Sequence, residues 1–391
     1  MPEAYIVAAK RTAGGKRGGA LRDWHPADLG AAVLDALVAD SEIDPAAIED
    51  VIMGCVSQAG EQAFHIGRSA VLASSLPESV PAVTIDRQCG SSQQSLHFAA
   101  QAVMSGTQDV VVAAGVESMT RVPMGTPFVA PAKAGLPSDP WSPAIKERFG
   151  VSQFSQFVGA EMIAQKYQMT REALDSFALE SHRKASAATE TGAFADEIVL
   201  LDGLDREGNT IRHDRDEGIR HDASMEGLAS LDPLTDGGVI TAGNASQICD
   251  GAAGLLVVSE RALKAHGLTP LARVDALAVT AGDPVMMLWE PIPATAKLLD
   301  RAGRSHADID LYEVNEAFAS VPLAWLHETG ADPDKLNVNG GAIALGHPLG
   351  GTGAKLATTM IHALKARGQR FGLQTMCEGG GIANATLIEA L

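Results

Sequence analysis

The stretch 83-VTIDRQCGSSQQSLHFAAQAVMSGTQDVVVAAG-115 contains a complete strand, turn, helix and strand, and its pattern indicates the fold class. The β-rich run of 82–85 predicts a strand, the apolar spacing of 90–105 predicts a helix, and the valine-rich run of 109–115 predicts a second strand. Glycine and two serines follow Cys89 and make the turn before the helix. Alternation of β and α elements is typical of a layered α/β protein, in which some strands can be antiparallel.

A similar unit lies near the C-terminus. A strand predicted over 335–338 leads into a glycine-rich turn at 340–353, a helix over 352–366 and a strand over 371–376 that runs on to three glycines. The likeness of the two units suggests an internal duplication. The same patterns predict further strands at 4–9, 50–55, 271–280 and 310–314, and further helices at 27–40, 157–167, 170–191, 294–302 and 317–328.

The composition of the sequence changes between the two units. Residues 120–144 are loop-like and rich in proline, and the stretch 202–226 is polar and charge-rich. We therefore predict an inserted loop domain between two halves. The predicted boundaries are an N-terminal half at 1–116, completed by 251–268, a loop domain at 117–250, and a C-terminal half at 269–391.

Composition excludes several classes of protein. Of 391 residues, 30 are basic and 48 acidic, which gives a formal net charge of −18, and 46% are apolar. The chain is too apolar for disorder, and its charge argues against nucleic acid as a partner. No signal-like start or membrane-length apolar run is present, so we expect a cytoplasmic protein without membrane insertion. Four cysteines without a C-x-x-C spacing argue against a disulfide framework and a zinc cluster.

Cys89 and Cys377 are the two cysteines whose surroundings suit chemistry. A thiol at a helix N-terminus is expected to have a lowered pKa, and the small residues after Cys89 leave backbone N–H groups free for an oxyanion. The competing interpretation is a buried packing cysteine. Cys377 precedes three glycines, which place a second thiol beside accessible backbone. We expect Cys55 and Cys249, inside apolar or small-residue runs, to serve packing alone.

His347 and Asn315 are the other candidates. His347 lies in GGAIALGHPLGGTG, where glycines and a proline make core packing unsuitable, so we favour a catalytic role. Asn315, in YEVNEAFAS, stands at a predicted strand-to-helix junction. An asparagine at that place is often only a helix N-cap.

Two further features carry no assigned function. The segment GHPLGGT has the glycine spacing of a phosphate-binding loop, but Thr352 replaces its essential lysine. A basic cluster is conspicuous in so acidic a chain, and it comprises Lys10, Arg11, Lys16, Arg17 and Arg22.

Taken together, the motifs resemble those of the thiolase family. CGSS follows the pattern around the nucleophile, and NEAF at 315–318, GGAIALGHP at 340–348 and CxGxG at 377–381 occur in the family's order and spacing. TAGNAS and IRHDAS add matches in the loop domain. The resemblance covers essentially the whole chain. It implies a thiolase-like duplicated layered α-β-α-β-α fold with an inserted loop domain.

The resemblance also implies catalytic roles. Cys89 would carry the acyl group as a thioester, and His347 would take its proton. Cys377 would be the second acid and base, moving a proton at the acetyl-CoA methyl group. Asn315 would hold a water that stabilises an enolate oxygen together with His347. The backbone N–H groups of Cys89 and Gly379 would form a second oxyanion hole.

Coenzyme A is implied as a substrate rather than a permanently bound cofactor, and no metal is implied. The loop domain would cover it, and Arg220 would supply a local cationic entrance to an acidic protein. The residues carried over by motif are Arg220 for the nucleotide, Ser246 for the pantetheine, and Ala242, Gly243, Ala317 and Phe318 for the tunnel. The family forms dimers or dimers of dimers, so a homodimer or a homotetramer is expected.

The resulting functional prediction is cleavage of a 3-ketoacyl-CoA by coenzyme A, as in fatty acid β-oxidation. The products would be acetyl-CoA and a shortened acyl-CoA, formed by ping-pong catalysis through an acyl-cysteine. Acetoacetyl-CoA synthesis and a non-catalytic lipid-binding protein are the alternatives. A β-ketoacyl synthase is disfavoured, because such enzymes use two histidines where this chain has Asn315 and Cys377.

Two departures bear on the acyl chain. Short-chain biosynthetic thiolases usually carry a His-Met pair where this sequence has Ser155-Gln156, and a serine common near the coenzyme falls at Gly227. The stretches SQFVGAEMIA and ASQICDGAA are more similar to thiolases that shorten bulky acyl chains, including steroid side chains. The chain length and branching of the substrate stay open at this point.

Overall fold

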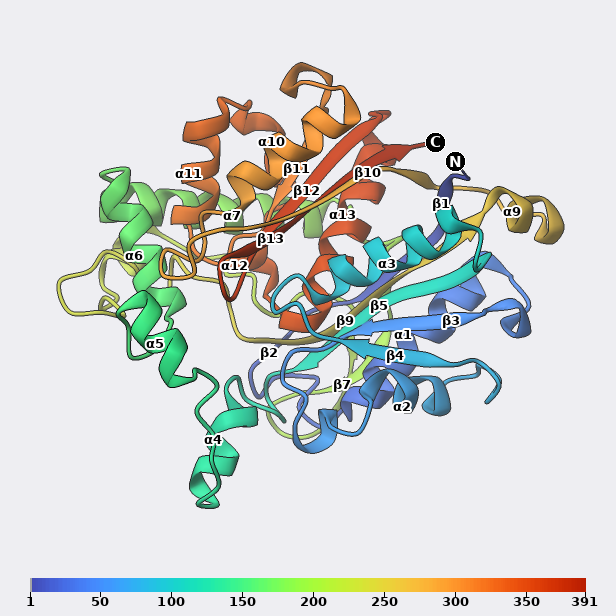
Figure 1. The fold of residues 1–391 in the computed structure, drawn as a ribbon, viewed down its shortest axis with the longest axis horizontal. Coiled ribbons are helices and arrows are strands. Elements are labelled where there is room, and N and C mark those ends of the chain that lie inside the picture. The colour runs from blue at the N-terminus through green and yellow to red at the C-terminus, as the bar shows by residue number, and fades with distance from the viewer. Residues whose placement is uncertain (1) are drawn as a thin grey trace.

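The computed structural model describes residues 2–391 and contains two similar α/β halves with a long insertion (Figure 1). The elements of the first half are β1 (Ala4–Thr12), β2 (Gly15–Lys16), α1 (Pro26–Ser41), β3 (Asp50–Gly54), α2 (Ile66–Ala73), β4 (Ala82–Ile85), α3 (Ser91–Ser105), β5 (Val110–Ser118) and β9 (Cys249–Ser259). The elements of the second half are α9 (Glu260–His266), β10 (Ala272–Ala281), α10 (Pro291–Ala302), β11 (Leu311–Val314), α11 (Ser320–Thr329), α12 (Ala342–Leu345), α13 (Thr352–Arg367), β12 (Phe371–Glu378) and β13 (Ile382–Ala390).

The insertion is mostly helical. Its elements are α4 (Thr126–Lys133), α5 (Pro143–Phe149), α6 (Gln156–Lys166), α7 (Arg171–Glu190), β6 (Ile198–Val199), β7 (Leu201–Leu204), β8 (Thr210–His213) and α8 (Met225–Ala229). Short 3₁₀ turns occur at Pro45–Ala47, Gly60–Gln62, His306–Asp308, Pro333–Lys335 and Leu349–Gly351. Within residues 2–391, no helix has both the length and the apolar character needed to cross a membrane.

The strands follow the same pairing scheme in both halves. The sheet order is β11-β12-β13-β10-β1-β9-β5-β3-β4, with β2 and β6 at its side. The pairs β3–β5 and β11–β12 are parallel, whereas β5–β9 and β12–β13 are antiparallel. The two halves meet at the antiparallel pair β1–β10. This repeated order is what an internal duplication predicts.

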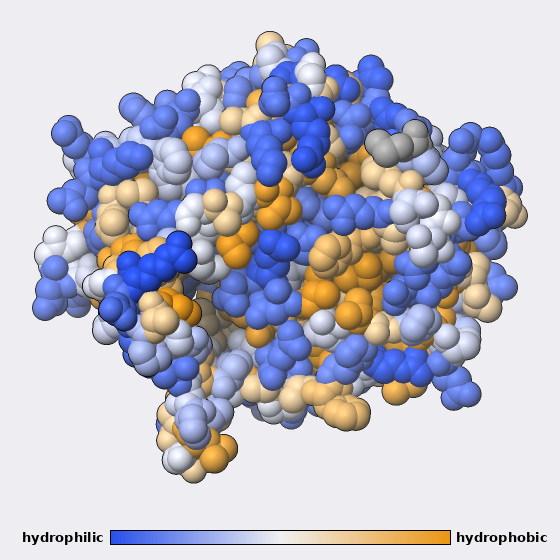
Figure 2. Space-filling view, viewed as in Figure 1, coloured by the Kyte–Doolittle hydropathy of each residue, from blue (hydrophilic) through white to orange (hydrophobic). Residues whose placement is uncertain are grey.

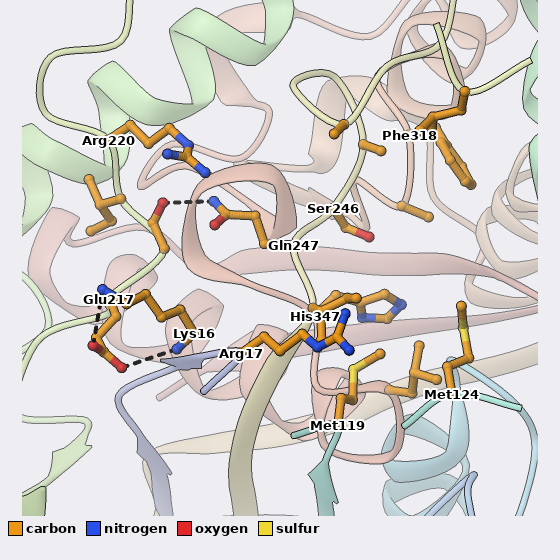
Figure 3. A pocket seen from close by; sticks show the side chains of 18 of the residues that line it. Lys16, Arg17, Met119, Met124, Glu217, Arg220, Ser246, Gln247, Phe318 and His347 are labelled. Atoms are coloured by element: carbon orange, nitrogen blue, oxygen red, sulfur yellow. Dashed lines mark hydrogen bonds and ion pairs between the residues drawn. The ribbon is translucent and has the colours of Figure 1, made fainter. Parts of the chain in front are cut away.

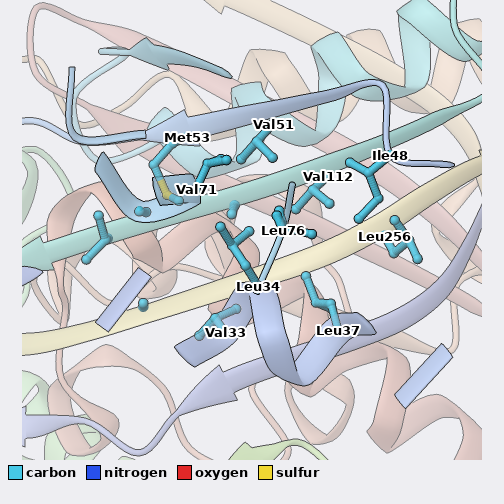
Figure 4. Packing of buried hydrophobic residues seen from close by; sticks show 14 of the residues in the cluster. Val33, Leu34, Leu37, Ile48, Val51, Met53, Val71, Leu76, Val112 and Leu256 are labelled. Carbon is cyan, nitrogen blue, oxygen red and sulfur yellow. The ribbon is translucent and has the colours of Figure 1, made fainter. Parts of the chain in front are cut away.

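Helices and strands alternate in five layers. α3 and α13 pack against each other in the middle, between the strands of the two halves. α1 and α2 cover the outer face of the first half, and α10 covers that of the second. Figure 4 shows Leu34 and Leu37 of α1 pointing toward Val112 and Leu256 of the sheet. Each such fully buried side chain contributes about 1.5–3 kcal/mol.

Two predictions of secondary structure are corrected. The segment 335–338 is not a strand, because Asn337 has a left-handed φ of 44° and the segment forms only isolated bridges, Leu336 with Tyr312 and Val338 with Gly340. The stretch 120–144 is not all loop, because it contains α4 and the start of α5. Prolines stand in the first turns of both helices, where their missing N–H costs nothing.

A fully buried ionic network fixes the insertion to both halves. Arg11 of β1 pairs with Glu197 and with Asp216, and Lys355 of α13 also contacts Asp216. Burial by itself raises the pKa of Asp216, but Arg11 and Lys355 outweigh it and lower the pKa to about 2. Asp216 also accepts a hydrogen bond from the backbone N–H of Gly14 at 2.7 Å. The carboxylate therefore stays ionised and joins three separate segments.

Candidate active site

Cys89 lies on a tight turn between β4 and α3. Gln88 before it has a left-handed φ of 49°, and the N–H of Gly90 donates to the carbonyl of Arg87 at 3.1 Å. A Cβ atom on Gly90 would fall 1.8 Å from Oε1 of Glu378, so only glycine fits there. Cys89 as a whole residue is partly exposed, although its sulfur lies deeper in the protein. The turn thus holds the thiol at a fixed place.

Two backbone N–H groups converge on the Cys89 sulfur. One belongs to Cys89 itself and the other to Gly379, which follows the end of β12. Convergent N–H groups stabilise negative charge that develops on an atom placed between them. The structure therefore brings together the two groups that the sequence motifs paired.

The expectation of a lowered pKa at Cys89 is wrong. Burial raises the pKa of this thiol to about 12, and the Glu378 side chain beside it acts in the same direction. The two backbone N–H groups oppose this effect but are outweighed. Burial also raises the pKa of Glu378 well above its ordinary range. The resting site therefore holds a neutral thiol, which needs a base to become a nucleophile.

His347 is buried and held in one tautomer. Its Nδ1 lies 2.6 Å from the hydroxyl of Thr352, and that hydroxyl donates its single proton to the carbonyl of Pro348 at 2.8 Å. Nδ1 must therefore carry the proton and donate to Thr352, which leaves Nε2 with a free lone pair. Nε2 has no hydrogen-bond partner within residues 2–391. Burial, assisted by the charge of Lys355, lowers the pKa of His347 to about 3.

Contacts from the first half and from the insertion fix the loop that carries His347. The N–H of His347 donates to the carbonyl of Gln247 at 3.0 Å, and that of Gly350 donates to the carboxylate of Glu117 at 2.9 Å. Gly346 has a φ of 82°, and a Cβ there would meet the Cys249 sulfur at 2.6 Å. Cys249 is buried and packs against this loop, as is expected of a packing cysteine.

Cys377 and Asn315 lie at the ends of neighbouring strands. Cys377 is fully buried in β12, and burial followed by the charge of Cys89 raises its pKa well above the ordinary range. Asn315 follows β11, and its backbone N–H donates to the carbonyl of Thr375 at 3.1 Å. The N-cap interpretation of Asn315 is wrong, because α11 starts later and is capped by Ala319. Within residues 2–391, neither polar atom of the buried Asn315 amide has a partner.

A cavity of about 820 Å³ opens beside His347 (Figure 3). Such a volume accommodates a large organic ligand. The insertion and both halves contribute to its walls. Its lining includes most of the residues predicted to contact coenzyme A, namely Arg220, Ser246, Ala242, Ala317 and Phe318. Gly243 does not line it and lies against Leu228 and Leu231 instead.

The sequence alone did not identify several of the residues that line the cavity. Lys16 ends β2 and Arg17 follows it, and Met119 and Met124 come from the segment after β5. The basic cluster was the feature of the sequence that could have pointed to Lys16 and Arg17. The methionines carry no pattern that separates a cavity wall from a packed core.

The described part of the chain gives little support for a metal site or a disulfide. Residues 2–391 contain no cluster of three or more histidine, cysteine or acidic side chains that could hold a metal ion. All four cysteines are free thiols.

Comparison with known protein families explains why these features of the fold and the site occur together. The family model described as "Thiolase, N-terminal domain" matches residues 4–261, and the one described as "Thiolase, C-terminal domain" matches residues 268–390.

The chain belongs to the thiolase family.

It is therefore an acyltransferase enzyme. A steroid 3-ketoacyl-CoA thiolase of Mycobacterium tuberculosis, FadA6, is 52% identical to it over 100% of this chain and 95% of the relative. A 3-ketoacyl-CoA thiolase of Yersinia pestis is 42% identical over all of both chains. A crystal structure of the Bacillus anthracis acetyl-CoA acetyltransferase superposes with a TM-score of 0.88 at 37% identity, covering 100% of this chain and 99% of that one.

Proposed function

We propose that this thiolase cleaves 3-ketoacyl-CoA substrates with coenzyme A, releasing acetyl-CoA and a shortened acyl-CoA. The observation that carries the proposal is the site itself: a neutral thiol under two N–H groups, an imidazole with a free Nε2, and a second buried thiol. The names of the two more similar relatives support a 3-ketoacyl-CoA substrate and a place in fatty acid β-oxidation.

The first half-reaction would form an acyl-enzyme. Nε2 of His347 takes the Cys89 proton, and the sulfur attacks the 3-keto carbon. The N–H groups of Cys89 and Gly379 stabilise the oxyanion that forms there. The bond between C2 and C3 then breaks, which leaves the acyl chain on Cys89 and an acetyl-CoA enolate. Cys377 protonates the enolate carbon, and His347 together with a water on Asn315 stabilises the enolate oxygen.

The second half-reaction would release the shortened chain. The Cys377 thiolate takes the proton of an incoming coenzyme A thiol, whose sulfur attacks the thioester carbonyl on Cys89. Collapse of this second oxyanion expels the Cys89 thiolate, which recovers its proton from His347. We further propose that residues 117–250 form the loop domain that covers coenzyme A, with Arg220 at the nucleotide and Ser246 at the pantetheine. Ala242, Ala317 and Phe318, which line the cavity, would lie along the tunnel.

Thr352→Val tests the tautomer of His347. Valine keeps the shape of threonine but cannot accept the Nδ1 proton, so the ring loses the contact that leaves Nε2 free. We expect kcat to fall about 10- to 100-fold, part of the usual contribution of a positioned base, with little change in KM. Steady-state kinetics measure both. Thr352→Ser keeps the hydroxyl and should stay near wild type, and equal losses in both variants would contradict this role.

The substrate is tested by a thiolysis panel that runs from acetoacetyl-CoA to long, branched and polycyclic 3-ketoacyl-CoA thioesters. The 52% identity to a steroid 3-ketoacyl-CoA thiolase leads us to expect a preference for bulky chains. A preference for acetoacetyl-CoA would favour acetyl-CoA acetyltransferase activity, which the Bacillus anthracis protein is named for. No cleavage of any member would contradict the proposed function.

We also propose that the protein works in the cytoplasm as a homodimer or homotetramer. β4 ends the sheet order, so one of its edges is unpaired, and Val83 and Phe98 are 39% and 40% exposed. Figure 2 shows apolar side chains gathered over this part of the molecule. An open sheet edge beside apolar surface favours a partner chain, here a second copy. Light scattering on the purified protein measures the mass in solution, and a monomer would contradict this proposal.

A further inference from the structure

Four side chains of the basic cluster in the N-terminal segment have ion-pair or hydrogen-bond partners within residues 2–391, and the fifth has none. Lys10 pairs with Asp40, and Arg11 lies in the buried ionic network. Lys16 pairs with Glu217 at 3.6 Å, and Arg22 donates to backbone carbonyls, including that of Leu204 at 3.1 Å. These four residues therefore have structural partners.

Arg17 is different from the other four. It is exposed, and its side chain has no ion-pair or hydrogen-bond partner within residues 2–391, yet it lines the cavity beside His347. An unpaired guanidinium in the wall of a ligand cavity is a binding group for an anion, since it carries five donors and a permanent charge.

The turn that carries Arg17 is firmly built. The N–H of Gly19 donates to the carbonyl of Lys16 at 2.7 Å, which closes the turn around Arg17. The Glu217 carboxylate accepts from the N–H groups of Lys16 at 3.1 Å and Ala20 at 2.8 Å. A Cβ on Gly19 would fall 2.3 Å from that carboxylate, so the close packing requires glycine. The backbone below Arg17 is therefore fixed before a ligand arrives.

The same contacts leave an uncompensated charge. Glu217 pairs with Lys16 at 3.6 Å, so Arg17 is the basic residue of this turn that lacks a carboxylate partner. Arg220 is the other arginine that lines the cavity, and it comes from the insertion. Figure 3 shows the two guanidinium groups at separate places. One anionic group of a ligand cannot serve both places.

We propose that Arg17 forms a second anion subsite, distinct from Arg220, which binds a carboxylate or phosphate group of the acyl-CoA substrate. The proposal rests on the proposed function, because it takes the cavity to be the acyl-CoA site. Two kinds of anion fit the chemistry. One is a carboxylate carried by the acyl chain, and the other is a phosphate of coenzyme A. Both present oxygens that a guanidinium binds through paired N–H donors.

The test crosses two substrate pairs with three variants. The acyl pair consists of 3-ketoacyl-CoA thioesters of equal length that end in a methyl group or in a carboxylate. The thiol pair is coenzyme A and dephospho-coenzyme A, which lacks the 3′-phosphate. The variants are Arg17→Ala, Arg17→Lys and Arg367→Ala. Arg367 is an exposed arginine at the end of α13 that does not line the cavity, so its variant controls for net charge.

We expect Arg17→Ala to lower kcat/KM about tenfold for the substrate that bears the recognised anion, through KM, with partial recovery in Arg17→Lys. A loss confined to the carboxylate-ended thioester assigns the acyl chain. A loss that disappears with dephospho-coenzyme A assigns the 3′-phosphate. An equal loss in all combinations that lysine restores assigns the diphosphate.

Two results would overturn the subsite. One is an Arg17→Ala variant that matches Arg367→Ala with every substrate, and the other is a uniform loss that Arg17→Lys does not restore. Both leave the proposed function intact when the wild-type enzyme cleaves 3-ketoacyl-CoA. Failure of the wild-type enzyme to cleave any thioester would instead contradict the proposed function.

Discussion

Cys89→Ala is expected to abolish thiolysis, with a loss of about 10³- to 10⁶-fold in kcat, because no other group then carries the acyl chain. The fold should survive, since the residue is partly exposed and alanine, which is smaller, fits the turn. Mass spectrometry after incubation with acetyl-CoA should find an acetyl group on the Cys89 peptide of the wild-type protein and none in the variant. Retained thiolysis in Cys89→Ala, without an adduct in the wild type, would refute the assignment.

Cys377→Ala is the matched variant, since it removes the other thiol of the pair. It should still form the acetyl adduct on Cys89, because acylation from acetyl-CoA needs only the nucleophile, its base and the two N–H groups. Formation and cleavage of carbon–carbon bonds should stop, because no group is left to move the proton at the methyl carbon. Full turnover in this variant would exclude the role proposed for Cys377.

Asp216→Asn is expected to lower the free energy of unfolding by about 3–5 kcal/mol, the usual loss when one partner of a buried ion pair is removed. Arg11 and Lys355 would then be left buried without a full set of counter-charges. Urea denaturation followed by circular dichroism measures the change. Glu260→Gln, in the exposed pair with Lys264, is the control and should leave the free energy of unfolding nearly unchanged.

The same network predicts a dependence on pH. The folded-state pKa of Asp216 is about 2, below the ordinary value of about 3.9 for an unfolded chain. Its contribution to stability is therefore fully present above about pH 4 and is lost as the pH falls toward 2. Asp216→Asn should lack this part of the acid dependence. A wild-type and a variant curve of equal slope between pH 4 and pH 2 would contradict it.

The repeated strand–turn–helix unit was predictable because local pattern and packing agree in it. β4 and α13 lie close to the predicted ranges, since each is an apolar run ended by turn residues. The segment at 335–338 has the same pattern, yet Asn337 takes a left-handed backbone, and only isolated bridges form at Leu336 and Val338. The periodicity of a sequence does not predict the left-handed backbone angle of a single residue.

Electrostatics in the site were less predictable than its residues. The sequence places Cys89 before a helix, which favours the thiolate, but it does not tell how deeply the sulfur is buried or that Glu378 packs under Gly90. The free Nε2 of His347 depends on Thr352, five residues away on the next turn of chain. The role proposed for Arg17 depends on the pairing of its neighbour Lys16 with Glu217, about two hundred residues away. These facts arise from folding, and no local motif records them.

The two halves differ in what their corresponding turns present. The turn before α3 offers a thiol, whereas the loop before α13 offers an imidazole. A half that paired with an identical copy of itself would bring together two thiols or two imidazoles, and neither combination joins a nucleophile to its base. The chemistry thus requires that the two corresponding turns differ, and a single chain holding both halves meets this requirement.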